Sequence, residues 1–315
     1  MSTHIARSLL PCLLAAMAIG SLAGCRSAGP LRTLENSVVF APTTYPTGNW
    51  QPTGVNFEDA WFTADDGTKL HGWYVPHENP RAVVLYAHGN AGNLSDRAYL
   101  LPVLHDQLDL SVMMFDYRGY GRSEGSPDEQ GILRDARAAR TWLARRVGIA
   151  ENDIVLMGRS LGGAVAIDMA AADGARGLII ESTFTSLPDM AGELLPMTPA
   201  KWLMSNWLDS LDKISKYRGP LLHSHGRDDS LIPFEQGQQL FAAANQPKRF
   251  LAIPGTDHND QQPAGYYRAV DAFIDQLPKP KRPIAVRETI PSLDIKLLGH
   301  ETITSRRDRI DRVVR

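Results

Sequence analysis

The strongest chemical pattern of the chain surrounds one serine, Ser160. This residue lies in the sequence Gly-Arg-Ser-Leu-Gly over residues 158–162, between an apolar run at 154–157 and a helical pattern that begins at Leu161. Small residues two positions either side of a serine permit a sharp strand-to-helix turn that lifts the hydroxyl clear of a sheet. The pattern predicts a nucleophile; the alternative is a structural serine in a glycine-rich turn.

A serine hydroxyl is a weak nucleophile at neutral pH, so it needs a base nearby and an acid that orients the base. Asp229 follows an apolar run at 220–224, and His258 follows another at 250–253. If these runs are parallel strands, both side chains lie at the carboxyl ends of the strands, where ligands bind in open α/β sheets. We therefore expect them to meet near Ser160.

Neighbouring residues offer alternatives for both roles. Asp228 is adjacent to Asp229, and His223 and His225 lie at the end of the preceding apolar run. A histidine at the end of a strand is more often a satisfied structural residue, which favours His258 as the base. On position alone, either aspartate can be the acid.

These segments resemble the α/β-hydrolase superfamily, close to its serine aminopeptidase and monoacylglycerol-lipase-like branch. The resemblance covers residues 55–277 and includes Asp-Tyr-Arg-Gly-Tyr-Gly-Arg-Ser at 116–123, a structural turn near the pocket in that branch. The superfamily order is Ser, then Asp or Glu, then His. Its pattern of His-Gly, two variable residues and Asp implies that the triad is Ser160, Asp229 and His258.

Catalysis of this kind also requires hydrogen-bond donors for the oxyanion that forms on the attacked carbonyl. One donor is usually the main-chain amide after the nucleophile, here that of Leu161. The sequence His-Gly-Asn-Ala-Gly-Asn at 88–93 follows an apolar run and resembles the superfamily's oxyanion loop. The resemblance implies Asn90 as the second donor.

Short apolar runs and helical patterns alternate along the body of the chain, which predicts strands and crossover helices in a mostly parallel sheet. The expected strands are 82–87, 110–115, 154–157, 177–181, 220–224 and 250–253. The expected helices are 95–107, 129–147, 161–172, 234–244 and 266–276. This is the α/β pattern, and the resemblance specifies the α/β-hydrolase fold over residues 55–278.

The interval between the fourth and fifth expected strands is too long for a simple crossover. It is rich in large apolar residues, among them Leu194, Met197, Trp202 and Trp207. We expect a small helical cap over about 184–216, inserted into the hydrolase domain. A pair of ordinary amphipathic helices packed on the sheet is the alternative.

The first residues have the layout of a signal peptide: Arg7 is followed by an uncharged stretch over residues 9–23. Leu-Ala-Gly-Cys at 22–25 resembles the lipobox of bacterial lipoproteins, which implies that residues 1–24 are removed and that Cys25 is acylated. We then expect residues 25–54 to form a tether between the membrane anchor and the folded body. An ordinary secretory signal is the alternative. Arg26 lacks the acidic character associated with inner-membrane retention, which mildly favours the outer membrane of a bacterial envelope.

A basic segment closes the chain. Residues 279–315 carry ten Lys or Arg against five Asp or Glu, so we expect a solvated tail that can contact anionic lipid headgroups. The whole chain has a formal net charge of -2 and an isoelectric point near 6.5, which gives no electrostatic reason to expect nucleic acid. We expect no metal and no cofactor, because no zinc-ligand spacing, phosphate loop or dinucleotide fingerprint is present.

The expected protein is therefore a lipid-anchored serine hydrolase of the carboxylesterase or lipase kind. Its substrate would be a small ester or thioester with an acyl chain. A peptidase, an acyltransferase with the same triad, and a non-catalytic envelope binding protein on a hydrolase scaffold are the alternatives, because a fold does not establish an activity.

Overall fold

The computed structural model describes residues 30–280, except 55, 196 and 198–203. An eight-stranded sheet runs through this part, in the order β1-β2-β4-β3-β5-β6-β7-β8. Strands β3 to β8 are parallel, while β2 pairs antiparallel with both β1 and β4. The strand bounds are β1 Glu58–Thr63, β2 Lys69–Val75, β3 Ala82–Ala87, β4 Leu110–Phe115, β5 Val155–Arg159, β6 Gly177–Glu181, β7 Leu221–Gly226 and β8 Lys248–Ile253. The predicted α/β-hydrolase fold, mostly parallel and flanked by helices, is confirmed.

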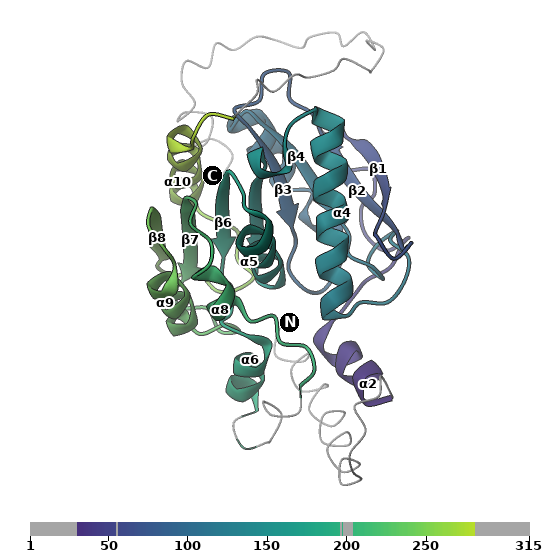
Figure 1. The fold of residues 1–315 in the computed structure, drawn as a ribbon, viewed down its shortest axis with the longest axis vertical. Coiled ribbons are helices and arrows are strands. Elements are labelled where there is room, and N and C mark those ends of the chain that lie inside the picture. Colours follow the sequence, from purple (N-terminus) through teal and green to yellow (C-terminus); the bar gives the residue numbers. More distant parts are fainter. Residues whose placement is uncertain (1–29, 55, 196, 198–203, 281–315) are drawn as a thin grey trace.

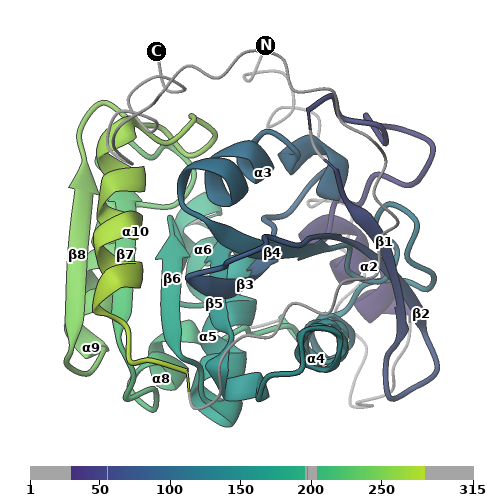
Figure 2. The same ribbon diagram turned by 90° about the horizontal axis from the view of Figure 1, so that it is seen from above.

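Helices cover both faces of the sheet (Figure 1; Figure 2). Their bounds are α2 Pro30–Val39, α3 Leu100–Pro102, α4 Glu129–Val147, α5 Leu161–Asp173, α6 Leu187–Leu194, α8 Ser210–Ile214, α9 Phe234–Ala243 and α10 Ala264–Gln276. Seen from above, α3 and α10 lie on one side of the sheet, and α4, α5 and α8 on the other. The central strands are therefore buried on both faces, which explains why they read as continuous apolar runs.

Strand β3 shows how this arrangement divides the core. Val83, Leu85 and Ala87 belong to the core beneath α4 and α5, whereas Val84 and Tyr86 belong to the core beneath α10. Successive side chains of a strand point to opposite faces, so one apolar run supplies both cores. The sheet is thereby fixed in position, and its carboxyl edge becomes a rigid platform.

The expected strands all form, with ends shifted by at most two residues. The antiparallel pair β1 and β2 was not among them. Strand β1 alternates buried and exposed residues over only six positions, a weaker pattern than a continuous apolar run. The expected helix over 95–107 is instead a 3-10 turn at Leu94–Arg97, the short α3 and a π-type turn at Val103–Gln107. Pro102 has no N–H for regular helical bonding at this point.

The tether expected over residues 25–54 is wrong for the part that the structure describes. Residues 30–54 form helix α2 and then a segment that lies on the body, with Phe40 only 1% exposed. Pro42 bridges to Gly92 and Thr44 to Gly121. The many Pro, Thr and Gly residues of this segment suit an irregular path, but main-chain hydrogen bonds fix that path in place.

In the described residues of the expected cap, the chain forms the short helices α6 and α8. Helices α2 and α6 lie at the same end of the sheet (Figure 1). Glu35 of α2 accepts hydrogen bonds from Ser205 and Asn206, at distances of 3.0 and 2.9 Å from their main-chain nitrogens.

The expected signal peptide, Cys25 and nearly all of the basic tail lie outside the described residues. In the part described, no helix is long and apolar enough to cross a bilayer.

Candidate active site

Ser160 occupies a strained turn between β5 and α5. Its backbone has φ 55° and ψ -119°, an unfavourable combination for a residue with a side chain. Glycines on both sides make the turn possible: a Cβ on Gly162 would lie 1.9 Å from the main-chain oxygen of Ala87, and one on Gly158 would lie 2.1 Å from that of Gly162. The Gly-x-Ser-x-Gly spacing is therefore a requirement of close backbone packing, and the strain is of the kind that collects at functional sites.

The start of α5 lies directly behind this serine. Ser160 is the residue before the first helical turn, and its own amide donates to the oxygen of Glu181 at 2.9 Å. Within the described residues, the amide of Leu161 donates to no acceptor. An unpaired amide at the positive end of a 13-residue helix can stabilise a developing negative charge.

Asp229 and His258 come together as the sequence predicts. Asp229 Oδ2 lies 2.9 Å from His258 Nδ1, and both side chains are buried. Asp229 Oδ1 accepts the amides of Leu231 at 3.0 Å and Ile232 at 2.8 Å, which fixes the carboxylate plane. Burial opposes ionisation of Asp229, but the hydrogen bond from His258 and the other favourable contacts outweigh it, so the pKa of this carboxyl lies below its ordinary value.

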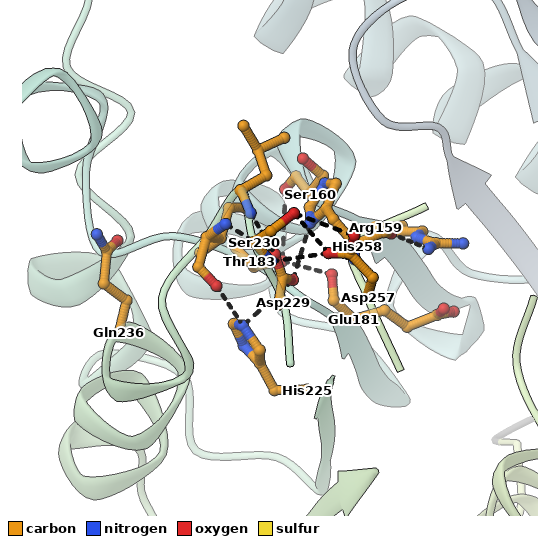
Figure 3. Close-up of polar contacts among 12 residues, drawn as sticks. Arg159, Ser160, Glu181, Thr183, His225, Asp229, Ser230, Gln236, Asp257 and His258 are labelled. Carbon is orange, nitrogen blue, oxygen red and sulfur yellow. Dashed lines mark hydrogen bonds and ion pairs between the residues drawn. The ribbon is translucent and has the colours of Figure 1, made fainter. Parts of the chain in front are cut away.

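The contact through Nδ1 leaves Nε2 on the opposite edge of the imidazole ring. Figure 3 shows Ser160, His258 and Asp229 gathered at one place, with Ser160 and His225 on opposite sides of Asp229 in that view. This orientation is the one that a histidine needs to exchange a proton with a nearby hydroxyl while an aspartate holds its other nitrogen.

The neighbouring aspartates differ from Asp229. Asp228 is exposed, and among the described residues no hydrogen bond or ion pair links it to a histidine. Asp257, beside the base, accepts the Ser230 amide at 2.7 Å and the His258 amide at 2.6 Å. The acid loop and the base loop are therefore tied to each other by Asp257.

The alternative bases lie deeper in β7. His223 is fully buried, and neither of its ring nitrogens has a hydrogen-bond partner among the described residues. His225 Nε2 lies 3.0 Å from the oxygen of Ile232 and 3.5 Å from Asp229 Oδ2. His225 thus supports the acid loop from behind, and burial lowers its pKa.

The loop at 88–93 passes next to the nucleophile. A Cβ on Gly89 would lie 3.4 Å from the Cβ of Ser160. Like that of Leu161, the main-chain amide of Asn90 donates to no acceptor in the described part of the chain. The Asn90 side chain, by contrast, is fully engaged with residues outside the loop: its Nδ2 donates to the oxygen of Val39 at 2.6 Å, and its Oδ1 accepts from Tyr120 at 2.7 Å.

Two charged residues that the sequence analysis did not single out flank the site. Arg159, next to the nucleophile, donates through Nη2 to the main-chain oxygens of His258 and Asp260, the latter at 3.0 Å. Its register partner Glu181 is fully buried and accepts from Tyr266 at 2.5 Å. Burial raises the pKa of Glu181 against the opposing charge of Arg159. Each of these two residues is the charged last residue of an otherwise apolar strand, and this pattern could have indicated them from the sequence.

No group of three or more His, Cys, Asp or Glu side chains is placed to hold a metal ion in the described residues. The groups placed for catalysis in this part of the chain are the Ser160 hydroxyl and the hydrogen-bonded pair of His258 and Asp229.

Sequence comparisons identify relatives over most of the chain. A family model described as serine aminopeptidase, S33, matches residues 78–213, which include Ser160 and end before the acid and the base. An uncharacterised protein of Mycobacterium tuberculosis is 36% identical over 230 residues, covering 72% of this chain and 82% of that protein. The α/β-hydrolase domain-containing protein WAV2 of Arabidopsis thaliana is 34% identical over 286 residues, covering 80% and 91%.

Solved structures share the fold at lower identity. An esterase of Pyrococcus furiosus superposes with a TM-score of 0.63 at 21% identity, over 76% of this chain and 98% of that one. Acetyl xylan esterase 1 of a Thermoanaerobacterium superposes with a TM-score of 0.54 at 18% identity, over 72% and 86%. The relatives show that the chain belongs to the α/β-hydrolase family, and within it residues 78–213 match the serine aminopeptidase (S33) model.

Proposed function

We propose that the protein is a serine hydrolase that cleaves carboxylic esters or thioesters. The observation that carries this proposal is the buried hydrogen bond between His258 and Asp229, formed at the edge of the sheet where the turn at Ser160 presents its hydroxyl. Family membership and the esterases among the structural neighbours support it.

The proposed reaction has two stages. Ser160 Oγ attacks the ester carbonyl while His258 Nε2 takes its proton, and the amides of Leu161 and Asn90 bind the oxyanion. The intermediate collapses, His258 returns the proton to the leaving alcohol or thiol, and an acyl-enzyme remains. Water then attacks the acyl-enzyme with His258 as base, which releases the acid and restores Ser160. In both stages, Asp229 keeps His258 in the tautomer that carries its proton on Nδ1, and it stabilises the imidazolium that forms when His258 takes up the second proton.

Exposed apolar side chains in the loop that carries the acid and in the segment between β6 and β7 support a substrate with an acyl chain. Leu231 lies two residues from the acid and is 41% exposed, and Trp207, whose main-chain oxygen binds the start of α6, is 54% exposed. Such side chains provide an apolar surface for hydrocarbon. A peptide substrate is the second candidate, favoured by the description of the family model as a serine aminopeptidase.

The test is hydrolysis of nitrophenyl esters of increasing acyl length and of aminoacyl nitroanilides by the purified protein and by Ser160→Ala. We expect ester turnover that Ser160→Ala abolishes. Turnover of the anilides alone would replace the esterase proposal with a peptidase. Added alcohol, followed by product analysis, separates hydrolysis from acyl transfer. A folded protein that is inactive on every substrate supports a binding protein instead.

We also propose that Cys25 carries a lipid that anchors the protein in a bacterial envelope, a proposal that rests on the sequence at residues 22–25. Radioactive palmitate should label the wild type in bacteria and should not label Cys25→Ser, which should leave the membrane fraction. Equal labelling of both proteins would contradict the anchor.

A further inference from the structure

The N-terminal segment over residues 39–47, named here the strap, lies along the loop that carries Asn90. Asn90 Nδ2 donates to the oxygen of Val39 at 2.6 Å, and Asn90 Oδ1 accepts the amide of Ala41 at 3.0 Å. The hydroxyl of Tyr120 supplies a second donor to the same oxygen at 2.7 Å. The carboxamide of Asn90 is thus held by the strap on one side and by Tyr120 on the other.

The contact continues along the loop. The amide of Thr43 donates to the oxygen of Gly92 at 2.9 Å. Asn93 Nδ2 donates to the oxygens of Thr43 at 3.2 Å and Thr47 at 2.9 Å. The strap therefore binds the loop at three successive points, Asn90, Gly92 and Asn93, rather than touching it once.

The strap is itself fixed to the body. Phe40 is buried in the core at 1% exposure. The amide of Tyr45 donates to the oxygen of Gly121 at 2.8 Å, and the amide of Gly121 donates to that of Thr43 at 2.9 Å. A segment anchored in this way can transmit a fixed position to the loop that it binds.

The backbone of the loop is unusual at two residues. Ala91 and Gly92 have φ of 62° and 73°, the left-handed region that a residue with a side chain seldom adopts. The loop's inner end is supported from the sheet, because Tyr117 donates to the oxygen of His88 at 2.9 Å. At Asn90, the side-chain hydrogen bonds in the described structure are those to the strap and to Tyr120.

We propose that the Asn90 side chain is a positioning group whose bonds to the strap aim the main-chain amide of Asn90 at the oxyanion. The strap is then part of the active site, although it lies more than 100 residues before the nucleophile in the chain. This inference rests on the proposed function, because it assigns how one oxyanion donor is held.

The first test compares Asn90→Ala with the matched control Asn79→Ala, an exposed asparagine before the amino end of β3, whereas Asn90 follows its carboxyl end. The readouts are kcat and KM for a soluble nitrophenyl ester, and the inhibition constant of an alkyl boronic acid, which binds the serine as a transition-state analogue. Loss of an oxyanion donor costs about 10²- to 10³-fold in kcat. A misdirected donor should cost about 10- to 100-fold, with KM within about twofold and the inhibitor weakened by the same factor as kcat/KM.

A second variant covers the case in which Asn90→Ala fails to fold. Tyr120→Phe removes one of the two donors to Asn90 Oδ1 and leaves the ring in place, so kcat should fall several-fold. Tyr217→Phe is its control, because among the described residues the Tyr217 hydroxyl bonds to the main-chain oxygens of Ala175 and Pro220 and not to the loop or the strap. The control should match the wild type.

The outcomes separate the two proposals. A wild type that does not hydrolyse esters and does not bind the boronic acid ends the proposed function. An active wild type whose folded Asn90→Ala and Tyr120→Phe variants keep kcat and inhibitor affinity overturns the positioning role alone. A change in KM without a change in kcat also overturns it, because it would show a role in ground-state binding.

Discussion

Two adjacent aspartates give a sharp test of the acid assignment. Asp229 is buried and lies 2.9 Å from His258 Nδ1 through one carboxylate oxygen, whereas Asp228 is exposed. The perturbation is Asp229→Asn, with Asp228→Asn as its matched control. Both changes remove one negative charge at nearly constant volume, one residue apart.

The size of the effect follows from what asparagine can and cannot do at this position. Its oxygen can still accept the amides of Leu231 and Ile232, which bond to Asp229 Oδ1 at 3.0 and 2.8 Å. Its NH₂ group must then face His258 Nδ1 and donate to it. The imidazole is held in the tautomer with the proton on Nε2, and this nitrogen cannot accept the Ser160 proton. The same change in a Ser-His-Asp triad lowers kcat by about 10⁴-fold.

The assay is hydrolysis of a soluble nitrophenyl ester, with thermal unfolding as the check on folding. We expect about a 10⁴-fold loss of kcat in Asp229→Asn, little change in KM, and activity within twofold of the wild type in Asp228→Asn. A folded Asp229→Asn that keeps more than about a tenth of the activity would refute the reasoning, as would an equal loss in Asp228→Asn.

Three further predictions concern the surroundings of the site. Arg159→Ala should lower kcat/KM by up to about 10²-fold, because the loop that carries His258 loses its donor; millimolar guanidinium should restore part of the activity, and full activity without it would contradict this role. Burial lowers the pKa of His223 from 6.5 to about 3, so below pH 6.5 the unfolded chain takes up a proton that the folded chain does not. This linkage should cost about 2 kcal/mol of stability at pH 5. In urea unfolding, His223→Leu should therefore lose less stability than the wild type between pH 7.5 and 5, and equal losses would count against the account. Gly162→Ala should yield no folded protein, because its Cβ would overlap the end of β3, whereas Gly265→Ala, whose Cβ would lie 3.8 Å from Arg268 Nη2 in an ordinary contact, should fold and unfold no lower than the wild type.

The parts of the fold that were predictable are those whose cause is local. Helix α4 has the predicted bounds because Asp128 caps its start and Gly148, with φ 77°, ends it. The central strands could be predicted from the sequence because burial on both faces requires continuous apolar runs. The antiparallel pair β1 and β2 lacked this signal: one face of β1 is exposed, and the apolar run of β2 is interrupted by His71 and Gly72.

The candidate site divides in the same way. Ser160 could be predicted because backbone packing at the turn demands glycines at fixed spacing, and His258 because it follows a strand. Asp229 also follows a strand, but its choice over Asp228 came from the resemblance to the superfamily pattern. The side-chain role of Asn90 was not readable: it depends on hydrogen bonds to residues about 50 positions earlier, in a segment whose composition suggested a tether. Contacts of this range leave no periodic trace in a sequence.

The central claim is that Ser160 is a nucleophile activated by His258. The most direct test is covalent labelling of the purified protein with a fluorophosphonate, followed by peptide mapping by mass spectrometry. The account predicts one modified residue, Ser160, with labelling abolished in Ser160→Ala and strongly slowed in His258→Ala. A folded wild type that resists the probe, or a label on a different serine, would contradict it.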